Sequence, residues 1–198
     1  MTKTFLFSTI ILLLSSCATY KALDNSLLEG KMPNNETFIL LKTGEVIKGE
    51  HISFAKDPGT MAAHREKRKG CWYSWDDWIA IDGKKFKRDS ICGYQEGGVN
   101  YTYYGCYKAR MLRHGKLNLY TYEKMLDARN TLTIFVYQKG SDQCNPKAIY
   151  KDLHEFYSTI SDNPEAATLC KKLFPILKRY QTDVSLRGIL AVVDKYNE

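Results

Sequence analysis

The chain of 198 residues lacks the short motifs that mark common enzyme sites. It contains no G-x-S-x-G, phosphate loop or dinucleotide fingerprint, and its four histidines show no metal-ligand spacing such as H-E-x-x-H. It also has no C-x-x-C pair, so a structural zinc site is not supported. The sequence therefore predicts no catalytic residue, no metal and no cofactor.

The chain also lacks a hydrophobic run long enough to cross a membrane as a helix. Its one long apolar segment, Phe5–Leu14, has ten residues, whereas a spanning helix needs about 20. The segment follows Lys3 and precedes two serines and Cys17, which is the three-part layout of a secretory signal. The stretch LSSC ending at Cys17 resembles the lipobox of bacterial lipoproteins.

The lipobox resemblance implies cleavage before Cys17 and attachment of lipid to that cysteine. Two or more acyl chains hold a protein stably to a membrane, whereas one holds it only marginally. Ala18 follows the cysteine, and in this lipoprotein pattern that residue favours the outer membrane. An ordinary cleaved signal with a free Cys17 is the alternative. We expect a signal peptide at 1–16, a lipidated tether at 17–35, and one domain at 36–198.

The charge balance is basic, with 29 Lys and Arg residues against 22 Asp and Glu residues. Cleavage would remove only Lys3 from this count and leave a net charge of +6. For an exported protein, this charge favours an anionic envelope glycan or lipid, or another envelope protein, as partner, rather than nucleic acid. The basic runs at 64–69 and 84–88 are candidate contacts, although ordinary solvated surfaces would explain them equally well.

Residues 36–138 have the pattern of a β-rich region. Short runs of β-branched and aromatic residues alternate with glycine turns, and Asp82-Gly83 is the strongest turn signal because a tight hairpin needs positive φ there. We predict one hairpin at 36–54, with a run on each side of a Thr43-Gly44 turn, and a second hairpin at 76–95, which turns at Asp82-Gly83. Further extended runs are predicted at 99–112, 116–123 and 131–138. Sequential strands of this kind predict an antiparallel sheet, curled into a barrel or a sandwich.

From Asn145 the hydrophobic period becomes helical. The dipeptides Asn145-Pro146 and Asn163-Pro164 predict two helix starts, because asparagine caps a helix and proline suits its first turn. A third helix is expected over 183–196. The sequence thus predicts an α+β domain, β-rich over 36–138, with about three C-terminal helices over 145–198 that cover the sheet.

Four stretches together resemble a group of uncharacterised exported proteins and lipoproteins of Bacteroidota. They are LKTGEVIKGEHISF, IAIDGKKFKRDSICGYQ, HGKLNLYTY and the terminal pair ISDNPEA and VVDKYN. This resemblance covers most of the chain after the signal and implies the bacterial envelope as its setting. It implies no catalytic or binding residue.

All three tryptophans lie in the stretch CWYSWDDW at 71–78. Indole faces stack on sugar rings, so Trp72 and Trp75 are candidates for a glycan-binding platform. Tyr101 and Tyr103 share one face of a predicted strand and are candidates for the same role. The alternative is that these aromatic side chains pack within the domain, as tyrosines in strands usually do.

Beyond Cys17, five cysteines are disulfide candidates if the compartment is oxidising. They are Cys71, Cys92, Cys106, Cys144 and Cys170. An odd number leaves at least one thiol unpaired, and fifteen arrangements with two bonds are open. Among them we expect a bond between Cys144 and Cys170, which would tie the start of the first long helix to the second.

These features predict a lipid-anchored envelope protein with a non-catalytic binding or scaffolding role. A glycan-binding module built on the Trp- and Tyr-rich segment is one alternative, and a small extracytoplasmic hydrolase is another. An aromatic row flanked by polar groups would favour the glycan module. A cleft with a histidine beside a carboxylate or thiol would favour the hydrolase.

Overall fold

The computed structural model describes residues 34–55, 78–125, 131–140, 142, 144–177 and 183–198. Its elements confirm the expected α+β class, with two antiparallel sheets followed by three C-terminal helices. Several predicted features lie outside the described residues: the signal peptide, most of the tether with Cys17, the basic run at 64–69, Cys71, Trp72 and Trp75.

The large sheet has eight strands in the order β11-β10-β9-β8-β7-β6-β1-β2, and the small sheet has the order β3-β4-β5. The strands of the large sheet are β1 (Thr37–Leu41), β2 (Val46–Gly49), β6 (Ile91–Glu96), β7 (Val99–Tyr104), β8 (Tyr107–Arg113), β9 (Leu117–Met125), β10 (Thr131–Lys139) and β11 (Lys147–Ala148). Those of the small sheet are β3 (Ile52–Ala55), β4 (Trp78–Ile81) and β5 (Lys84–Lys87). The small sheet is joined to β6 through a short 3-10 helix, Arg88–Ser90.

Two predicted turns are confirmed. Asp82 and Gly83 join β4 to β5 with φ values of 48° and 83°, as a two-residue hairpin turn requires. Gly44, with φ of 85°, lies in the turn between β1 and β2. These residues were recognisable in the sequence because few others adopt positive φ without strain.

Three predicted segments are each divided in the structure. The second run of 76–95 splits into β5 of the small sheet and β6 of the large sheet, with the 3-10 helix between them. The segment 36–54 leaves the large sheet after β2 and enters the small sheet at β3, so its second run is two strands. The segment 99–112 is a hairpin of β7 and β8, which turns at Gly105 with φ of 61°. Tyr101, Tyr103 and Tyr107 keep a period of two across Gly105, which hid the break.

The three helices are α3 (Leu153–Ile160), α4 (Pro164–Leu177) and α5 (Asp183–Asn197). The starts predicted at Pro164 and Asp183 are confirmed, but the start at Asn145-Pro146 is wrong. Residues 147–148 form β11 and pair with β10. The first helix instead begins after Asp152, whose Oδ1 accepts a hydrogen bond of 2.8 Å from the Glu155 N–H.

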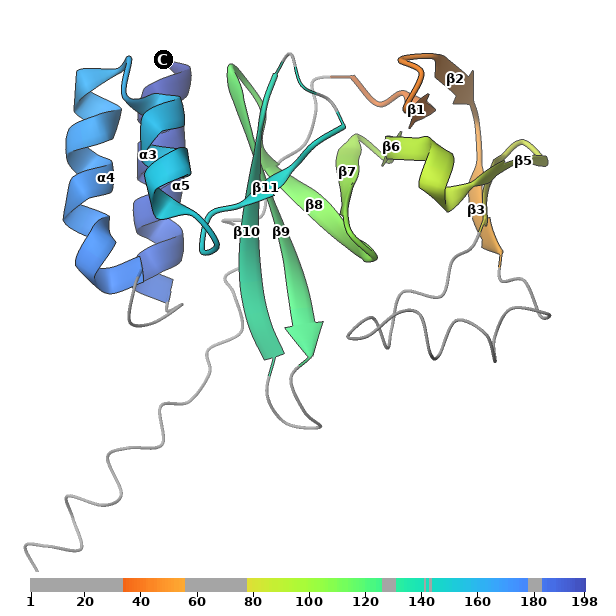
Figure 1. Cartoon of the computed structure of the whole chain (residues 1–198). Helices are drawn as coiled ribbons and strands as arrows, with labels where there is room; N and C mark the ends of the chain where they lie inside the picture. The colour runs from red at the N-terminus through yellow and green to blue at the C-terminus, as the bar shows by residue number, and fades with distance from the viewer. Residues whose placement is uncertain (1–33, 56–77, 126–130, 141, 143, 178–182) are drawn as a thin grey trace, which may run out of the picture.

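The helices and the small sheet cover the same face of the large sheet, at opposite ends (Figure 1). Near the helices, strand residues Leu119 and Phe135 join the core around Phe156. At the other end, Ile39 joins a core with Ile79 of the small sheet. Cross-strand pairing places Ile39, Tyr94, Tyr101, Arg110, Thr121 and Phe135 in one row on this face. The arrangement is therefore consistent with a sandwich.

The predicted disulfide between Cys144 and Cys170 is wrong. Cys92 in β6 is bonded to Cys144, with the two Cα atoms 4.7 Å apart, and Cys106 is disulfide-bonded as well. Cys170 is a buried free thiol in the helix core. The prediction placed Cys144 at the start of a helix, whereas that segment runs back along the sheet, so its cysteine meets a strand instead.

Candidate functional site

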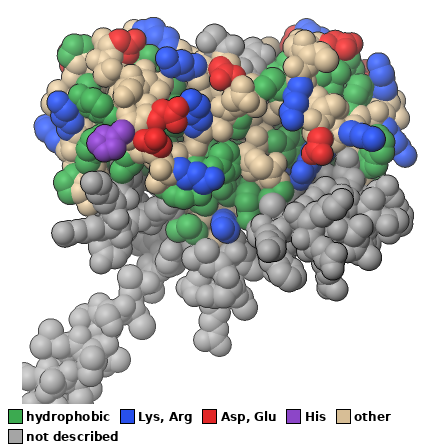
Figure 2. Space-filling model, in the orientation of Figure 1, with side chains coloured by type: hydrophobic (Ala, Val, Ile, Leu, Met, Phe, Trp, Pro, Cys, Tyr) green, Lys and Arg blue, Asp and Glu red, His purple; other side chains and the backbone are tan. Residues whose placement is uncertain are grey.

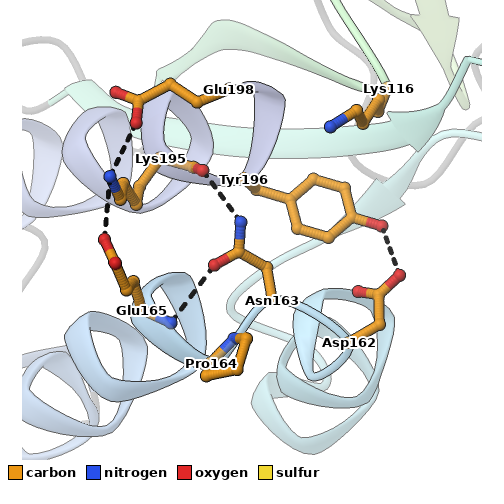
Figure 3. A pocket seen from close by; sticks show the side chains of 8 residues that line it. All are labelled: Lys116, Asp162, Asn163, Pro164, Glu165, Lys195, Tyr196 and Glu198. Atoms are coloured by element: carbon orange, nitrogen blue, oxygen red, sulfur yellow. Dashed lines mark hydrogen bonds and ion pairs between the residues drawn. The ribbon is translucent and has the colours of Figure 1, made fainter.

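Two cavities in the described part of the chain are large enough to consider as sites. The first, of about 470 Å³, lies between the N-terminus of α4, the C-terminal turn of α5 and Lys116 (Figure 3). The second, of about 230 Å³, lies on the large sheet. We call them the helix cavity and the sheet groove.

The charged groups of the helix cavity are largely engaged with one another. Lys195 lies 2.8 Å from Glu165 and 2.7 Å from Glu198, and these hydrogen bonds raise its pKa. The Tyr196 hydroxyl donates to Asp162 at 3.4 Å, and Asn163 links α4 to α5 (Figure 3). These contacts hold the helices together, so a structural role accounts for the cavity.

The sheet groove is lined mainly from the face opposite the helices and the small sheet, and Tyr94 and Tyr101 of the other face also border it. Strand side chains alternate between faces, and the groove takes alternate residues such as Phe38 and Leu40 from β1, Asn100 and Thr102 from β7, and Asn118 and Tyr120 from β9. The buried cluster beside it, with Ile134 and Val136, belongs to the same face. The groove is thus built into the sheet itself.

The large sheet must curl to form this groove. Gly93 of β6 and Gln138 of β10 both line it, although four inter-strand steps separate these strands. In a flat sheet they would be about 19 Å apart, at about 4.8 Å per step. The Cys92–Cys144 disulfide joins β6 to the segment after β10, and it therefore links parts of the curled sheet that are far apart in the strand order.

Two side chains of the groove carry buried oxygen atoms without a hydrogen-bond partner. They are Gln138 Oε1 and Asn100 Oδ1. Gln138 is only 3% exposed, and its amide nitrogen donates to the Asp142 carbonyl. Asn100 makes only a weak contact of 3.8 Å from its amide nitrogen to Met111 Sδ. Buried polar atoms are usually satisfied, so these two acceptors stand out as lacking a partner.

A short polar network forms one end of the groove. Asn118 Oδ1 accepts hydrogen bonds of 3.1 Å from the Gly115 N–H and from His114 Nδ1. Because an amide oxygen can only accept, His114 is the donor. Burial raises the pKa of Tyr120, partly opposed by a hydrogen bond with Asn118, so the phenol keeps its proton at neutral pH. The network can orient a ligand through hydrogen-bonding groups.

The described lining of the groove contains no Asp, Glu, Lys, Arg, Ser or Cys. Its only threonine, Thr102, donates to the Cys92 carbonyl at 3.2 Å. The histidine lies beside an amide, and neither a carboxylate nor a thiol is among the residues that line the cavity. Elsewhere in the described residues, no group of His, Cys, Asp and Glu is arranged to hold a metal. The arrangement can bind and orient, and it offers no nucleophile activated by a base.

The predicted tyrosines lie at the small-sheet side. Tyr101 and Tyr103 are half-buried and pack with the small-sheet core. The Tyr94 and Tyr101 rings stack with centroids 4.8 Å apart. Tyr101 also borders the groove, whereas Tyr103 does not. For these residues the structure shows packing, and their binding role stays a prediction.

The basic run at 84–88 lies along β5 and the turn after it. Lys84 stands 5.3 Å from the centroid of the Phe86 ring, and Lys87 stands 5.8 Å from that of the half-buried Trp78. Lysines on an exposed edge strand also discourage pairing with other chains. On the face shown in Figure 2, basic and acidic side chains are interspersed and form no single basic patch.

Sequence reasoning missed the groove residues Asn100, Asn118, His114 and Gln138. Each carries an ordinary polar side chain, and they are scattered over some 40 positions without a motif. The available signal was weak: polar amides in strands whose neighbours are apolar or aromatic, where β propensity disfavours asparagine. These residues come close together only because of the strand order, which cannot be predicted from the sequence pattern.

Comparison with protein-family models, with curated proteins and with solved structures finds no match to this chain. None of the helices in the described residues is long and apolar enough to cross a membrane.

Proposed function

We propose that the protein is a lipid-anchored protein of the bacterial envelope, exported and held by Cys17, which binds a ligand in the sheet groove without catalysis. The observation that carries the binding role is the pair of unpartnered buried acceptors, Gln138 Oε1 and Asn100 Oδ1, within one concave lining. Leaving buried acceptors unsatisfied costs about 1–3 kcal/mol each. A cost of this kind is typical of residues retained for function.

The chemistry of the lining supports binding over hydrolysis. A hydrolase built from side chains needs a nucleophile or an acid–base pair in reach of the substrate. His114 instead donates to the amide of Asn118, and the Thr102 hydroxyl is engaged with a backbone carbonyl. Both side chains therefore act as hydrogen-bond donors that stabilise the local structure.

The support for the anchor comes from the N-terminal sequence. The short apolar run at 5–14 followed by LSSC has the layout of a lipoprotein signal. The Cys92–Cys144 bond is in keeping with export, because disulfides form and persist mainly in oxidising compartments. With the domain held by acyl chains at its N-terminal tether, the groove needs no membrane contact of its own.

The anchor is tested by labelling cells with a fatty-acid analogue. We expect label on the native protein, a mass consistent with cleavage before Cys17, and recovery in the membrane fraction. The Cys17→Ser protein should take up no label, and Ser16→Ala, one position earlier, is the matched control that should still be labelled. An unlabelled native protein in the soluble fraction would overturn the anchor.

The binding role is tested separately by hydrogen exchange. Full-length protein in a detergent without a sugar headgroup is mixed with polysaccharide and low-mass extracts of the source cells. We expect slower exchange in peptides from β7 and β10, which line the groove from two sides, and no change in α4. Unchanged exchange in β7 and β10 with every extract would overturn the binding role.

A further inference from the structure

We propose that the ligand of the sheet groove is an uncharged, hydroxyl-rich molecule about the size of one sugar ring, such as a unit of a neutral saccharide. This inference rests on the proposed function and specifies the chemical class that the groove accepts.

The charge of the lining favours a neutral ligand. The chain has a net charge of +7, yet no Asp, Glu, Lys or Arg is among the residues that line the groove. An ionic group placed beside buried side chains needs an opposite charge to offset its loss of water. A phosphate, carboxylate or ammonium would find no such partner in this lining.

The hydrogen-bonding groups favour hydroxyls. Gln138 Oε1 and Asn100 Oδ1 are acceptors that need donors, and the Tyr120 hydroxyl lines the same groove. A hydroxyl group donates one hydrogen bond and accepts others, so neighbouring hydroxyls of one ligand can satisfy both kinds of group. An ether or a hydrocarbon would leave the two amide oxygens unpaired.

The apolar residues of the lining favour a ring with a C–H face. Phe38, Leu40 and Val46 line the groove from β1 and β2, and Met111 lines it from β8. Polar groups thus share the lining with an apolar strip, which suits a ligand that has hydroxyls at its rim and C–H groups on its faces. The volume of about 230 Å³ lies below the usual range of about 300–1,000 Å³ for drug-sized ligands. One ring fits this size better than an extended segment.

The location of the groove disfavours a peptide. Peptides that bind sheets commonly add a strand at an edge, where backbone groups are free. The groove instead lies mainly on strands that already pair on both sides, such as β7 between β6 and β8, although the edge strand β2 contributes Val46. A peptide in the groove would depend on side-chain contacts alone.

The test uses a matched pair of buried glutamines. Gln138 and Gln95 are 3% and 0% exposed, and each has a bonded amide nitrogen and an unpartnered Oε1. Gln138 lines the groove, whereas Gln95 does not. Methionine has a shape similar to that of glutamine. Gln138→Met therefore removes an acceptor from the groove lining, whereas Gln95→Met removes one that is not part of the lining.

The probes are methyl glycosides of glucose, mannose and N-acetylglucosamine, with glucuronate, glucosamine 6-phosphate and N-acetylalanine amide as charged and peptide-like comparisons. Binding to full-length protein in the same detergent is followed by the NMR signal of the Met111 methyl group, which lines the groove. We expect at least one neutral glycoside to shift this signal at millimolar concentration and the charged probes to leave it unchanged. Gln138→Met should weaken binding about tenfold, as loss of one hydrogen bond predicts, and Gln95→Met should stay within about twofold.

The outcomes separate this inference from the proposed function. A Met111 shift caused only by an anionic sugar or by the peptide-like probe would overturn the ligand class and leave a binding groove. Equal weakening by Gln138→Met and Gln95→Met would overturn the role of the Gln138 oxygen. If no probe shifts Met111, water alone satisfies the two oxygens and the inference fails. The exchange experiment with extracts then decides the proposed function independently.

Discussion

Asp82 shows how one side chain fixes the passage of the chain between the two sheets. It lies in the turn of the small sheet, yet its carboxylate accepts hydrogen bonds from the N–H groups of Glu50 and His51, at 3.0 Å for each closest contact. Its own N–H donates to the His51 carbonyl at 3.0 Å. A Cβ atom on Gly49 would overlap the Asp82 carboxylate. Glycine is therefore required where β2 ends.

Replacing Asp82 by alanine should lower the free energy of unfolding by about 2 kcal/mol, because two N–H groups lose a charged acceptor and alanine disfavours positive φ. Asp82→Asn should cost less, since its amide oxygen still accepts and asparagine tolerates positive φ. Urea denaturation of the wild type, Asp82→Ala and Asp82→Asn proteins measures their free energies of unfolding and so tests this order. The control is Asp89→Ala, whose carboxylate is 85% exposed and should contribute about 0.5 kcal/mol or less. An equal cost for Asp82→Ala and Asp89→Ala would contradict this account.

At the scale of the elements, the start of α4 is a junction as well as a cap. Asn163 Oδ1 accepts from the N–H groups of Glu165 and Ala166 at 3.2 and 3.1 Å, while its amide nitrogen donates to the Lys195 carbonyl of α5 at 3.0 Å (Figure 3). One asparagine thus satisfies the open end of one helix and holds the last turn of another. This dual role is what the Asn163-Pro164 signal could not reveal.

We expect Asn163→Ala to lower the free energy of unfolding by about 1–2 kcal/mol, because the cap and the link to α5 are both lost. Asn163→Asp keeps the acceptor oxygens and loses the donor to Lys195, so it should fall between wild type and alanine. Thr168→Ala, at an exposed site in the next turn, is the control and should change stability by about 0.5 kcal/mol or less. Thermal unfolding followed by circular dichroism ranks them. Asn163→Asp as costly as Asn163→Ala would show that the cap contributes little.

At the scale of the whole molecule, the Cys92–Cys144 bond links two parts of the large sheet that are far apart in the strand order. The two residues are 52 positions apart, and a loop of that length gives a chain-entropy stabilisation of about 4 kcal/mol. Removing the bond with Cys92→Ser and Cys144→Ser together should therefore lower the denaturation midpoint strongly. The Cys170→Ser protein, which keeps the bond, is the comparison.

Digestion without reduction should yield a linked Cys92–Cys144 peptide, identified by mass spectrometry. Alkylation of native protein should spare Cys170, because burial raises its pKa to about 11 and the thiol form is unreactive. Alkylation in denaturant should modify it. A linked Cys144–Cys170 peptide would contradict the structure.

Local chemistry made much of the fold predictable. Asp82-Gly83 predicts a turn because of the φ values that these residues adopt, and Asn163-Pro164 predicts a helix start because of capping. Both effects depend on adjacent residues only. The false helix start at Asn145 has an instructive cause. Ile149 does join the helix core together with Phe156 and Ile160, so the apolar spacing is real, but Ile149 reaches that core from the turn after β11. Periodicity reports which side chains are buried together, and it does not report the backbone that carries them.

The groove was beyond sequence reasoning because it depends on long-range pairing. Gly93 and Thr102 are opposite one another in the register, as are Leu40 and Gly93. No local rule places β1 beside β6. Packing across the whole sheet decides which strand pairs with which. In the sequence alone, each polar residue of the groove resembles a residue on a solvent-exposed face.

The pairing of β1 with β6 also dictates a sequence of events in biosynthesis. Strands β6 to β10 each pair with the next strand in the chain, so they can form as successive hairpins, which close quickly. β1 must wait for β6, with the small sheet lying between them in the sequence, and an isolated β1–β2 hairpin is only marginally stable. Residues 37–49 therefore emerge early and can pair only with each other until residue 96 has followed. This stretch is the most vulnerable to wrong association, and the groove, which needs strands from both ends of the sheet, is completed among the last features.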